Sequence, residues 1–483
     1  MHTYTNMAPH LLWWRRATGA CAFVAAVTLV LALPYSGARA VRTTSSSTYT
    51  EAQQLNTRKF LNGFVHSMPG LQSIWVGDNF CAWKGVICLI DGVSISATNW
   101  TQLTAVSPGR LPEVSSADID VTQVFVNCIS IRANGLHLSG TLPPSWGLLR
   151  NLRKMRLERN GLTGSLPPEW SGLVNLVELH LSSNNLTGTL PTSWGENMKR
   201  LSFLSLNRNA LVGTLPPQWG RLKSIQALML EGNRLSGTLP AEWRRMQAVS
   251  TLLMGGNNLR GTLPPEWAEM SMMGWMDLHS NRLTGSLPAT WAMMTFLDTL
   301  LLFDNSLTGT LPSEWARLRW LEELHLQANV LVGTLPPSWS SMEFIHILDI
   351  SENALSGTLP ASWSSMQALD TLSISDNQLS GPIPSPWKTL PHIMHLHLVG
   401  NALCGCLPLN WTSPYVSVTV DEAVMSANCA TGNACNDVNV DSISSTISDT
   451  FSLSDASASA SASASPSSAS DDPSSGNMGD ASS

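Results

Sequence analysis

Apolar residues recur along this chain in one pattern that repeats every 24 residues. A typical unit runs from Leu176 to Trp194 and reads L-x-x-L-x-L-x-x-N-x-L-x-G-x-L-P-x-x-W. The alternation in Leu179-His180-Leu181 predicts a short strand whose leucines point into a core, while the residue between them points outward. One such strand has no partner within its own unit. We therefore expect the strands of successive units to pair as a parallel sheet.

One asparagine and one tryptophan recur with the same period. The asparagine stands at Asn160, Asn184, Asn209, Asn233, Asn257, Asn281, Asn305, Asn329, Asn353, Asn377 and Asn401. The tryptophan stands at Trp146, Trp170, Trp194, Trp219, Trp243, Trp267, Trp291, Trp315, Trp339, Trp363, Trp387 and Trp411, with one extra residue between Trp194 and Trp219. We expect the asparagine amides to bond backbone groups where the chain leaves the strand, and the tryptophans to fill the outer wedge between coils. A tryptophan at the same place in every copy favours packing over ligand binding.

This pattern contains the leucine-rich-repeat motif and predicts an α/β solenoid. We expect a parallel β-sheet on the concave face, a 3-10 or irregular convex side, disulfide-bonded caps and a disordered C-terminal tail. The predicted organisation is a signal peptide at 1–40, an N-terminal cap at 41–125, about twelve repeats at 126–411, a C-terminal cap at 412–435 and the tail at 436–483.

The first forty residues resemble a targeting segment. Arg15-Arg16 precedes the apolar run Ala17–Leu33, and Ala38-Arg39-Ala40 supplies small residues for cleavage. An uncleaved anchor is the alternative, although the run is short for a membrane span. In both cases we expect the repeats to reach the secretory lumen, and then the cell surface or the medium.

Cysteine usage also indicates an extracellular protein. Beyond the targeting segment, the cysteines flank the repeats at Cys81, Cys88, Cys128, Cys404, Cys406, Cys429 and Cys435. No pair has the two-residue spacing of a zinc site, so disulfide-bonded caps are favoured over metal binding. Their number is odd, and Cys128 in the first strand is the candidate for a free or intermolecular thiol. A buried, inert thiol is the simpler interpretation.

An N-terminal cap helix is predicted over Thr50–Met68. Helical spacing places Ala52, Leu55, Phe60, Phe64 and Val65 on one apolar face. We expect this face to cover the open end of the repeat core.

The composition changes after Cys435. Residues 436–483 contain seven aspartates and no lysine or arginine, which equals the formal net charge of −7, so the repeats are nearly neutral. Alternating serine and alanine over 457–465 predicts disorder, either as a carrier of glycans or phosphoglycans or as a plain spacer. No apolar C-terminal stretch of the kind a glycosylphosphatidylinositol anchor requires is visible. N-glycosylation sequons stand at Asn99, Asn185 and Asn410.

Two motifs resemble known proteins. Residues 81–88 read C-x-W-x-G-V-x-C, which is similar to the N-terminal cap of plant-type leucine-rich-repeat proteins and implies a Cys81–Cys88 disulfide. The recurring Gly-Thr-Leu-Pro-x-x-Trp, often followed by methionine as in Trp243-Arg-Arg-Met246, resembles the parasite surface antigens and proteophosphoglycans of Leishmania and its relatives. That resemblance implies host interaction, through a macrophage receptor or a complement component.

The outward residues of the strands are the natural contact surface of a solenoid. The leucines, asparagines and tryptophans that recur in each copy form the framework of the repeat. The outward residues, in contrast, vary from copy to copy. The central copies present an apolar strip with charged edges, and we predict that a protein partner docks there, between the repeats of Asn233 and Asn353. The predicted contact residues are Met229, Leu253, Trp275, Asp277, Leu301, Phe303 and Ile347. Neutral drift on an unused surface is the alternative.

Catalysis is not predicted. Asp277 with His279, or Asp349 with His325, could form acid–base pairs, but no nucleophile or enclosed pocket accompanies them. The histidines at 392, 395 and 397 have no acidic or cysteine ligand beside them in the local sequence, so we expect no metal. No phosphate loop or dinucleotide motif is present, and we expect no cofactor and no small-molecule substrate. With 27 basic and 34 acidic residues, nucleic acid is not an expected partner.

The sequence leaves two functions open. One is extracellular adhesion or recognition, through the concave wall or through displayed glycans. The other is a secreted or coat glycoprotein whose modified tail is the active part.

Overall fold

The computed structural model describes residues 42–43, 48–96, 109–114, 118–131, 138–405, 407, 411, 416–421 and 424. Internal contacts divide the chain into two units, Met1–Ala434 and Cys435–Ser483. The predicted signal peptide and tail, the sequons at Asn99 and Asn410, and the cysteines Cys406, Cys429 and Cys435 lie outside the described residues. The described residues all belong to the first unit, and none of their helices is long and apolar enough to cross a membrane.

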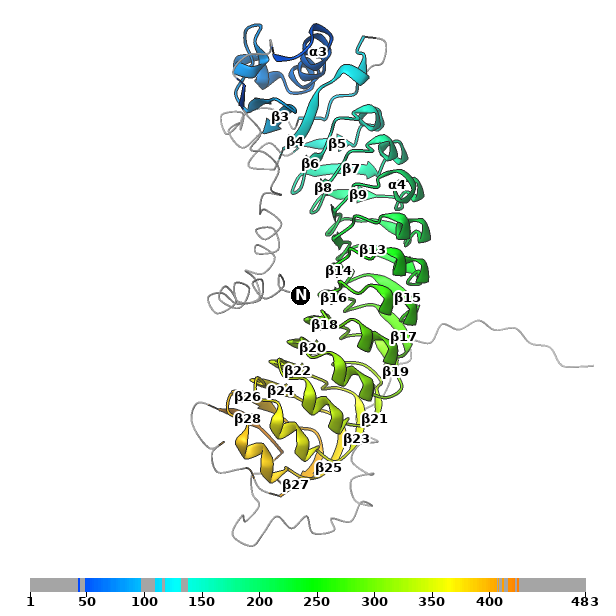
Figure 1. Cartoon of the computed structure of the whole chain (residues 1–483), viewed down its shortest axis with the longest axis vertical. Coiled ribbons are helices and arrows are strands. Elements are labelled where there is room, and N and C mark those ends of the chain that lie inside the picture. Colours follow the sequence, from blue (N-terminus) through cyan, green and yellow to red (C-terminus); the bar gives the residue numbers. More distant parts are fainter. Residues whose placement is uncertain are drawn as a thin grey trace, which may run out of the picture. The chain divides into compact units, whose positions relative to one another are not determined.

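A 16-stranded sheet runs through the stacked repeats, which follow one another in sequence order along the concave side of the first unit (Figure 1). Its first pairs, β1 with β2 and β2 with β3, are antiparallel, and every later pair is parallel. The strands are β1 (Arg42–Thr43), β2 (Val86–Leu89), β3 (Gly92–Ser96), β4 (Val126–Ser130), β6 (Lys154–Arg156), β8 (Glu178–His180), β10 (Phe203–Ser205), β12 (Ala227–Met229), β14 (Thr251–Leu253), β16 (Trp275–Asp277), β18 (Thr299–Leu301), β20 (Glu323–His325), β22 (Ile347–Asp349), β24 (Thr371–Ser373), β26 (His395–His397) and β28 (Ser417–Thr419).

The leucine positions set the register of this sheet. Leu179 in β8 pairs with Leu204 in β10, and Leu204 pairs with Leu228 in β12. All three side chains are fully buried. The parallel concave sheet predicted from the alternation is therefore confirmed. Its register is fixed because a shift by one residue would bring polar side chains into the core.

A second set of strands forms on the side that was predicted to be irregular. Each lies in the L-x-G segment, which follows a ladder asparagine for every strand except β5, and the strands pair in three parallel sheets. They are β5 (Ser139–Thr141), β7 (Gly161–Ser165), β9 (Asn185–Thr187), β11 (Val212–Thr214), β13 (Arg234–Gly237), β15 (Asn258–Thr262), β17 (Arg282–Ser286), β19 (Ser306–Thr308), β21 (Val332–Thr334), β23 (Ala354–Gly357), β25 (Gln378–Pro382) and β27 (Ala402–Cys404).

Glycine allows these second strands to pack closely. Gly213 has φ +84°, and a Cβ added to it would lie 2.8 Å from the Thr189 methyl of the preceding repeat. Any side chain there would meet both a strained backbone and a steric clash. One apolar leucine between polar neighbours is too short a signal to predict a strand from sequence.

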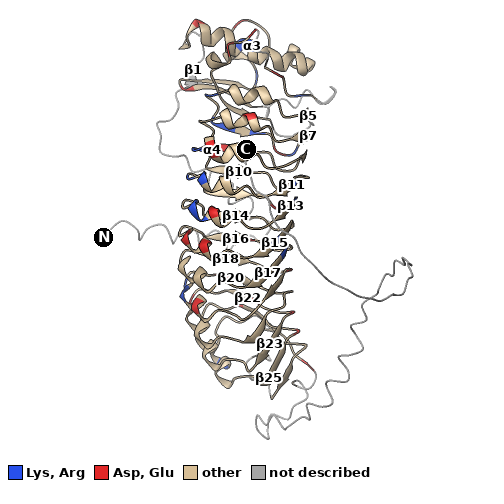
Figure 2. Cartoon of the chain, turned by 90° about the vertical axis from the view of Figure 1, so that its right-hand side faces the viewer, with Lys and Arg blue, Asp and Glu red and all other residues tan. Residues whose placement is uncertain are grey.

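Single turns of 3-10 helix complete the repeats at the L-P-x-x-W segment. They are η8 (Pro144–Leu148), η9 (Pro168–Gly172), η10 (Pro217–Arg221), η11 (Ala241–Arg245), η12 (Pro265–Glu269), η13 (Ala289–Met293), η14 (Ser313–Arg317), η15 (Pro337–Ser341), η16 (Ala361–Ser365) and η17 (Ser385–Thr389). The extra residue after Trp194 turns this segment into the α-helix α4 (Thr192–Asn197). Figure 2 shows the side of the stack away from the long sheet, where charged residues gather along the turns on the side of α4.

The tryptophans in these turns form internal stacks, from Trp170 to Trp219, from Trp243 to Trp291 and from Trp315 to Trp387. From Trp146 to Trp387 each is fully buried, and the rings of Trp243 and Trp267 stack with centroids 6.2 Å apart. Each indole N–H donates a hydrogen bond to a proline carbonyl of the preceding repeat, as from Trp267 to Pro240 at 2.9 Å. The sequence predicts the packing but not this bond, which provides the partner that a buried indole N–H requires.

The asparagines join neighbouring repeats. The Asn257 amide donates to the carbonyls of Leu230 at 3.1 Å and Met254 at 3.0 Å, and its Oδ1 accepts from the Leu235 N–H at 3.0 Å. Two of these three groups belong to the preceding repeat. The same set of bonds recurs along the ladder, for example at Asn184.

The N-terminal cap closes the start of the core. The helix α3 (Glu51–Ser67) begins with a capping box, in which Thr50 and Gln53 each accept a hydrogen bond from the other's backbone. Phe60 and Phe64 pack against Trp146, the first of the recurring tryptophans. Part of the predicted apolar face is wrong, because Leu55 is 55% exposed.

The buried face of α3 includes two polar residues that join the cap to the repeats. Asn56 accepts a hydrogen bond from the Asp120 N–H at 2.7 Å, and Thr57 accepts one from the Phe125 N–H at 2.9 Å. Helical periodicity of apolar residues alone could not show that these polar side chains are buried.

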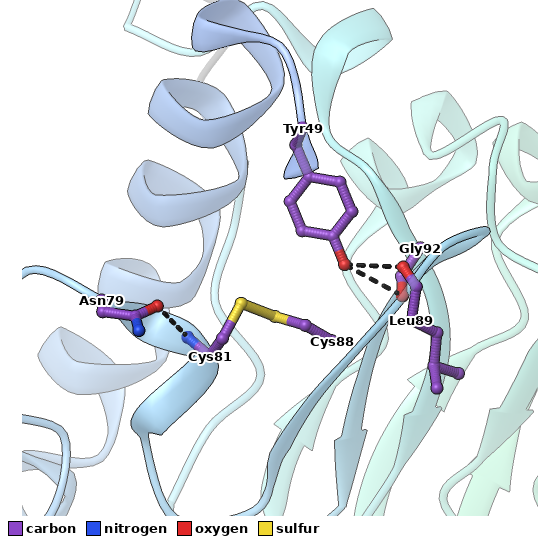
Figure 3. Close-up of a disulfide and its surroundings, with 6 residues drawn as sticks. All are labelled: Tyr49, Asn79, Cys81, Cys88, Leu89 and Gly92. Atoms are coloured by element: carbon purple, nitrogen blue, oxygen red, sulfur yellow. Dashed lines mark hydrogen bonds between the residues drawn. A yellow bond between two sulfur atoms is a disulfide. The ribbon is translucent and has the colours of Figure 1, made fainter. Parts of the chain in front are cut away.

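A disulfide holds the rest of the cap together (Figure 3). Cys81 is bonded to Cys88, as the resemblance to plant-type caps implied. The Asn79 side chain accepts a hydrogen bond from the Cys81 N–H at 3.1 Å, and the Tyr49 hydroxyl donates to the Leu89 carbonyl at 2.7 Å. The cap also contains η3 (Pro69–Ser73), η4 (Phe80–Ala82) and η7 (Val121–Gln123). At the other end, Cys404 is disulfide-bonded.

Candidate functional site

The candidate site is the outward face of the long sheet, called the concave wall below. In each strand the middle side chain is buried, so the first and third residues face outward, as does the residue two positions later. The first column is Lys154, Glu178, Phe203, Ala227, Thr251, Trp275, Thr299, Glu323, Ile347, Thr371 and His395. The second is Arg156, His180, Ser205, Met229, Leu253, Asp277, Leu301, His325, Asp349, Ser373 and His397. The third is Glu158, Ser182, Asn207, Glu231, Gly255, His279, Phe303, Gln327, Ser351, Ser375 and Val399.

The predicted contact residues share this wall but differ in exposure. Five are half-buried: Met229, Trp275, Leu301, Phe303 and Ile347. The other two are buried: Leu253 is only 6% exposed and Asp277 only 8%. Rows of the wall are one strand spacing apart, about 4.8 Å, so side chains of adjacent rows cover one another.

An aromatic centre, formed by His279, Phe303 and His325, occupies the middle of the wall. The His279 Nδ1 lies 2.5 Å from Asp277 Oδ1, and its ring stacks on Phe303 with centroids 4.6 Å apart. Phe303 meets His325 edge-on, with centroids 6.3 Å apart. The first acid–base pair suggested by the sequence therefore forms, as part of an aromatic stack.

The second suggested pair, Asp349 with His325, is arranged differently. Asp349 Oδ1 accepts hydrogen bonds from the backbone N–H of Ser351 at 3.1 Å and from its hydroxyl at 2.6 Å. Near the C-terminal end, the rings of His395 and His397 are 6.4 Å apart. Among the described residues, no group of three or more histidine, cysteine, aspartate or glutamate side chains is placed to hold a metal ion.

Gly255 makes the position of His279 possible. A Cβ at residue 255 would lie 2.2 Å from the His279 ring and 2.9 Å from Asp277 Oδ1. The imidazole therefore lies over bare backbone of the preceding repeat. In the sequence Gly255 is only one more outward residue, because the contact depends on the rotamer of a side chain one repeat later.

The two histidines of the aromatic centre titrate differently. The hydrogen bond to Asp277 raises the pKa of His279 despite partial burial, and the nearby carboxylates of Glu231 and Asp304 act in the same direction. Burial lowers the pKa of His325, and Asp349 and Glu323 oppose that shift only in part. The pKa values of the two histidines are therefore shifted in opposite directions on the two sides of Phe303.

The N-terminal end of the wall has a different character. Glu178 accepts hydrogen bonds from Lys154 Nζ at 2.6 Å and from Arg156 at 2.7 Å. Burial alone would raise the pKa of Glu178, but the nearby His180 ring and the hydrogen bonds from Lys154 and Arg156 hold it well below its usual range. The His180 ring stacks on Phe203, with centroids 4.4 Å apart. Lys154, Arg156 and Glu178 thus form an ionic cluster in which the carboxylate pairs with both basic side chains.

Cys128 is the free cysteine of the described residues and lies at the start of the same wall. It pairs in register with Ser94 on one side and Lys154 on the other. Burial raises the pKa of its thiol above the ordinary value, which disfavours the reactive thiolate.

A second apolar surface, which the strand pattern does not reveal, lies beside the turns. Its members stand five residues after the ladder tryptophan in successive repeats. Met272 is 52% exposed, Phe296 60% and Trp320 49%, and Trp320 stacks on Phe344 with centroids 4.7 Å apart. We call these four residues the lateral ridge. The repeat period could have revealed them if every phase of the pattern had been compared, not only the strand.

The sequon at Asn185 is accessible. Asn185 opens β9 on the side away from the wall and is exposed, while its neighbour Asn184 is buried. A glycan at this position would not cover the concave wall.

Comparison with known proteins agrees with this geometry. The Leucine Rich Repeat family pattern matches residues 151–173, 175–197 and 368–390. The surface membrane glycoprotein GP46/M-2 of Leishmania amazonensis is 37% identical over 144 residues, which are 30% of this chain and 29% of that protein. The chain thus matches less than a third of this relative. The resemblance to the leucine-rich-repeat surface antigens of Leishmania predicted from the sequence is confirmed.

Solved structures extend the likeness over most of the chain. The ectodomain of the plant receptor kinase GASSHO1/SCHENGEN3 from Arabidopsis thaliana, in complex with CASPARIAN STRIP INTEGRITY FACTOR 2, has a TM-score of 0.62 and 27% identity, covering 77% of this chain and 47% of that one. The PEPR1–AtPEP1 structure has a TM-score of 0.60 and 26% identity, covering 77% and 52%. The chain is a leucine-rich-repeat solenoid, a fold that these receptor ectodomains share and that is consistent with protein–protein recognition.

Proposed function

We propose that this protein is a non-catalytic recognition protein of the cell surface or the extracellular medium, which binds a protein partner through the middle of its concave wall. The observation that carries this proposal is the contrast between framework and wall. Framework positions repeat the same residue, whereas the wall presents Trp275, Leu301, Phe303 and Ile347 half-exposed within the four rows from β16 to β22. Large apolar side chains collected on one surface are typical of protein interfaces.

Two further observations support the proposal. The similar plant ectodomains are solved with peptide or protein ligands, and the Leishmania relative is a surface membrane glycoprotein. By that likeness the partner would be a host molecule, either a macrophage receptor or a complement component. The route to the surface would be the secretory pathway through the segment at 1–40.

The test is attachment of the purified full chain to macrophages. The double variant Trp275→Ser, Phe303→Ser should lose attachment at least tenfold, because both anchors of the wall are removed. The matched control is Phe296→Ser, Trp320→Ser, which removes two equally large apolar residues from the lateral ridge and should leave attachment unchanged. If the control loses attachment and the wall variant keeps it, the contact surface is the ridge and the proposal is wrong.

A secreted or coat glycoprotein is the second candidate, and the serine-rich, acidic composition of residues 436–483 favours it. In that case the repeats would hold a modified tail away from the surface. Full chain produced without glycosylation separates the two functions. Retained attachment supports recognition by the wall, and complete loss supports the tail.

A further inference from the structure

The concave wall is electrically divided along its length. Each row has two edges, formed by the residue just before the strand and the residue just before the ladder asparagine. From Arg153 to Arg208, rows and edges together carry five basic residues and two acidic ones: Arg153, Lys154, Arg156, Arg159 and Arg208 against Glu158 and Glu178. The N-terminal end therefore has a net charge of +3, as 5 minus 2.

The rest of the wall is acidic. From Gln226 to Gly400, where every residue is described, the rows and edges contain no lysine or arginine. They contain ten carboxylates: Glu231, Asp277, Asp298, Asp304, Glu322, Glu323, Asp349, Glu352, Asp370 and Asp376. An excess of one sign over seven consecutive rows creates a field that attracts the opposite charge.

The acidic residues flank the apolar strip. Asp298, Glu322 and Asp370 stand on the edge before the strands. Asp304, Glu352 and Asp376 stand on the opposite edge and are exposed. Between the two edges lie the half-buried side chains of the strip, from Met229 to Ile347. The wall thus offers apolar contacts in the middle and carboxylates on both sides.

Two buried oxygen atoms also indicate a ligand that donates hydrogen bonds. Glu231 Oε2 and Gln327 Oε1 are buried in the third column without a hydrogen-bond partner in the described part of the chain. Burial, with Asp277 nearby, raises the pKa of Glu231 above its ordinary value. A buried acceptor without a donor is costly, and a cationic donor would relieve that cost.

We propose that the wall between Gln226 and Gly400 binds an extended segment of a partner protein in which basic residues flank apolar ones. This inference rests on the proposed function and names the chemistry of its partner. The strip from Met229 to Ile347 spans five row intervals of about 4.8 Å, or roughly 24 Å, which an extended segment of about seven residues covers. Apolar side chains of the segment enter the strip, and its lysine and arginine side chains reach the acidic edges.

The test uses the full chain and two labelled nine-residue peptides, one alternating leucine with arginine and one alternating leucine with glutamate. Fluorescence anisotropy should show binding of the arginine peptide. This binding should weaken at least tenfold between roughly 50 and 500 mM salt, because salt screens the attraction between exposed charges. The glutamate peptide should not bind. Equal binding of both peptides would contradict the inference.

Charge reversal on the wall locates the contact. In Asp304→Arg, Glu352→Arg, arginine is placed at a backbone position that Arg159 and Arg208 already occupy with φ near +55° in other repeats. This variant should bind the arginine peptide at least tenfold more weakly. The control Glu242→Arg, Glu266→Arg makes the same change of net charge on exposed turn residues and should bind normally. Equal weakening in both variants would show non-specific attraction and overturn the inference.

Failure here and failure of the proposed function are distinguishable. If the arginine peptide does not bind while Trp275→Ser, Phe303→Ser still abolishes cell attachment, the wall is the site and the partner chemistry is wrong. If attachment survives that double variant, the proposed function itself fails.

Discussion

Trp267 and Trp275 stand only eight residues apart, in consecutive repeats, yet their roles differ. Trp267 is fully buried in the stack and donates its indole N–H to the Pro240 carbonyl. Each of the other repeats has a tryptophan at the same position. Trp275 stands half-buried on the wall, where the other repeats carry residues as different as Lys154 and Ala227. One position is fixed by what each repeat needs to stack, and the other is free to vary. The positions that stack the repeats are therefore distinct from the positions that vary on the wall.

Replacing the two tryptophans should give the largest contrast. Trp267→Ala leaves a cavity between coils and removes the indole donor to the Pro240 carbonyl, and should lower the free energy of unfolding by about 3–5 kcal/mol. Trp275→Ala should lower it by about 1 kcal/mol or less, because its side chain is half-buried and the wall is open. Urea unfolding followed by circular dichroism measures both, with several probes because solenoids need not unfold in one step. Equal losses would remove the distinction between framework and wall.

Replacing two glycines of the wall, one at a tightly packed position and one at an open position, tests how closely the wall is packed. Gly255→Ala drives a methyl group into the His279 ring and should cost about 1–3 kcal/mol while displacing the aromatic centre. Gly274→Ala is the control, because the nearest atom to its added Cβ is 3.5 Å away and the contact is ordinary. The chemical shifts of the His279 ring protons should move in the first variant only. If Gly255→Ala changed neither the stability nor the His279 chemical shifts, the imidazole would be free to repack.

The smallest expected effect depends on pH. The pKa of His279 is raised in the folded state, so its stabilisation is fully present below the unfolded value near 6.5 and is lost as the pH rises through the folded value. His279→Gln should therefore destabilise the protein more at pH 6 than at pH 9.

His325 is the internal comparison. Its pKa is lowered, so the folded state loses stability as the pH falls from 6.5 through the folded value. His325→Gln should remove that acid sensitivity. Urea midpoints at pH 5, 6 and 9 measure both variants, and parallel pH profiles would contradict the opposite shifts.

Sequence predicts the features that every copy shares. The role of Asn257 follows from its recurrence and from the backbone groups that an amide can satisfy, and the burial of Leu228 follows from alternation. The burial of Leu253 and Asp277 does not, because it depends on the side chains in adjacent rows. The stacking of His279 over Gly255 likewise needs the rotamer of one side chain and the absence of another. The division of charge along the wall is visible in the sequence once the outward register is known from the strands.

The helix α4 shows how the repeats accommodate insertion. One additional residue after Trp194 is taken up by changing a 3-10 turn into an α-turn, while β8 and β10 on either side still pair in register and Trp194 still stacks on Trp219. A turn can therefore lengthen by one residue without changing the register of the concave wall. A repeat can gain length on one side of the solenoid while its outward strand residues keep their places on the other.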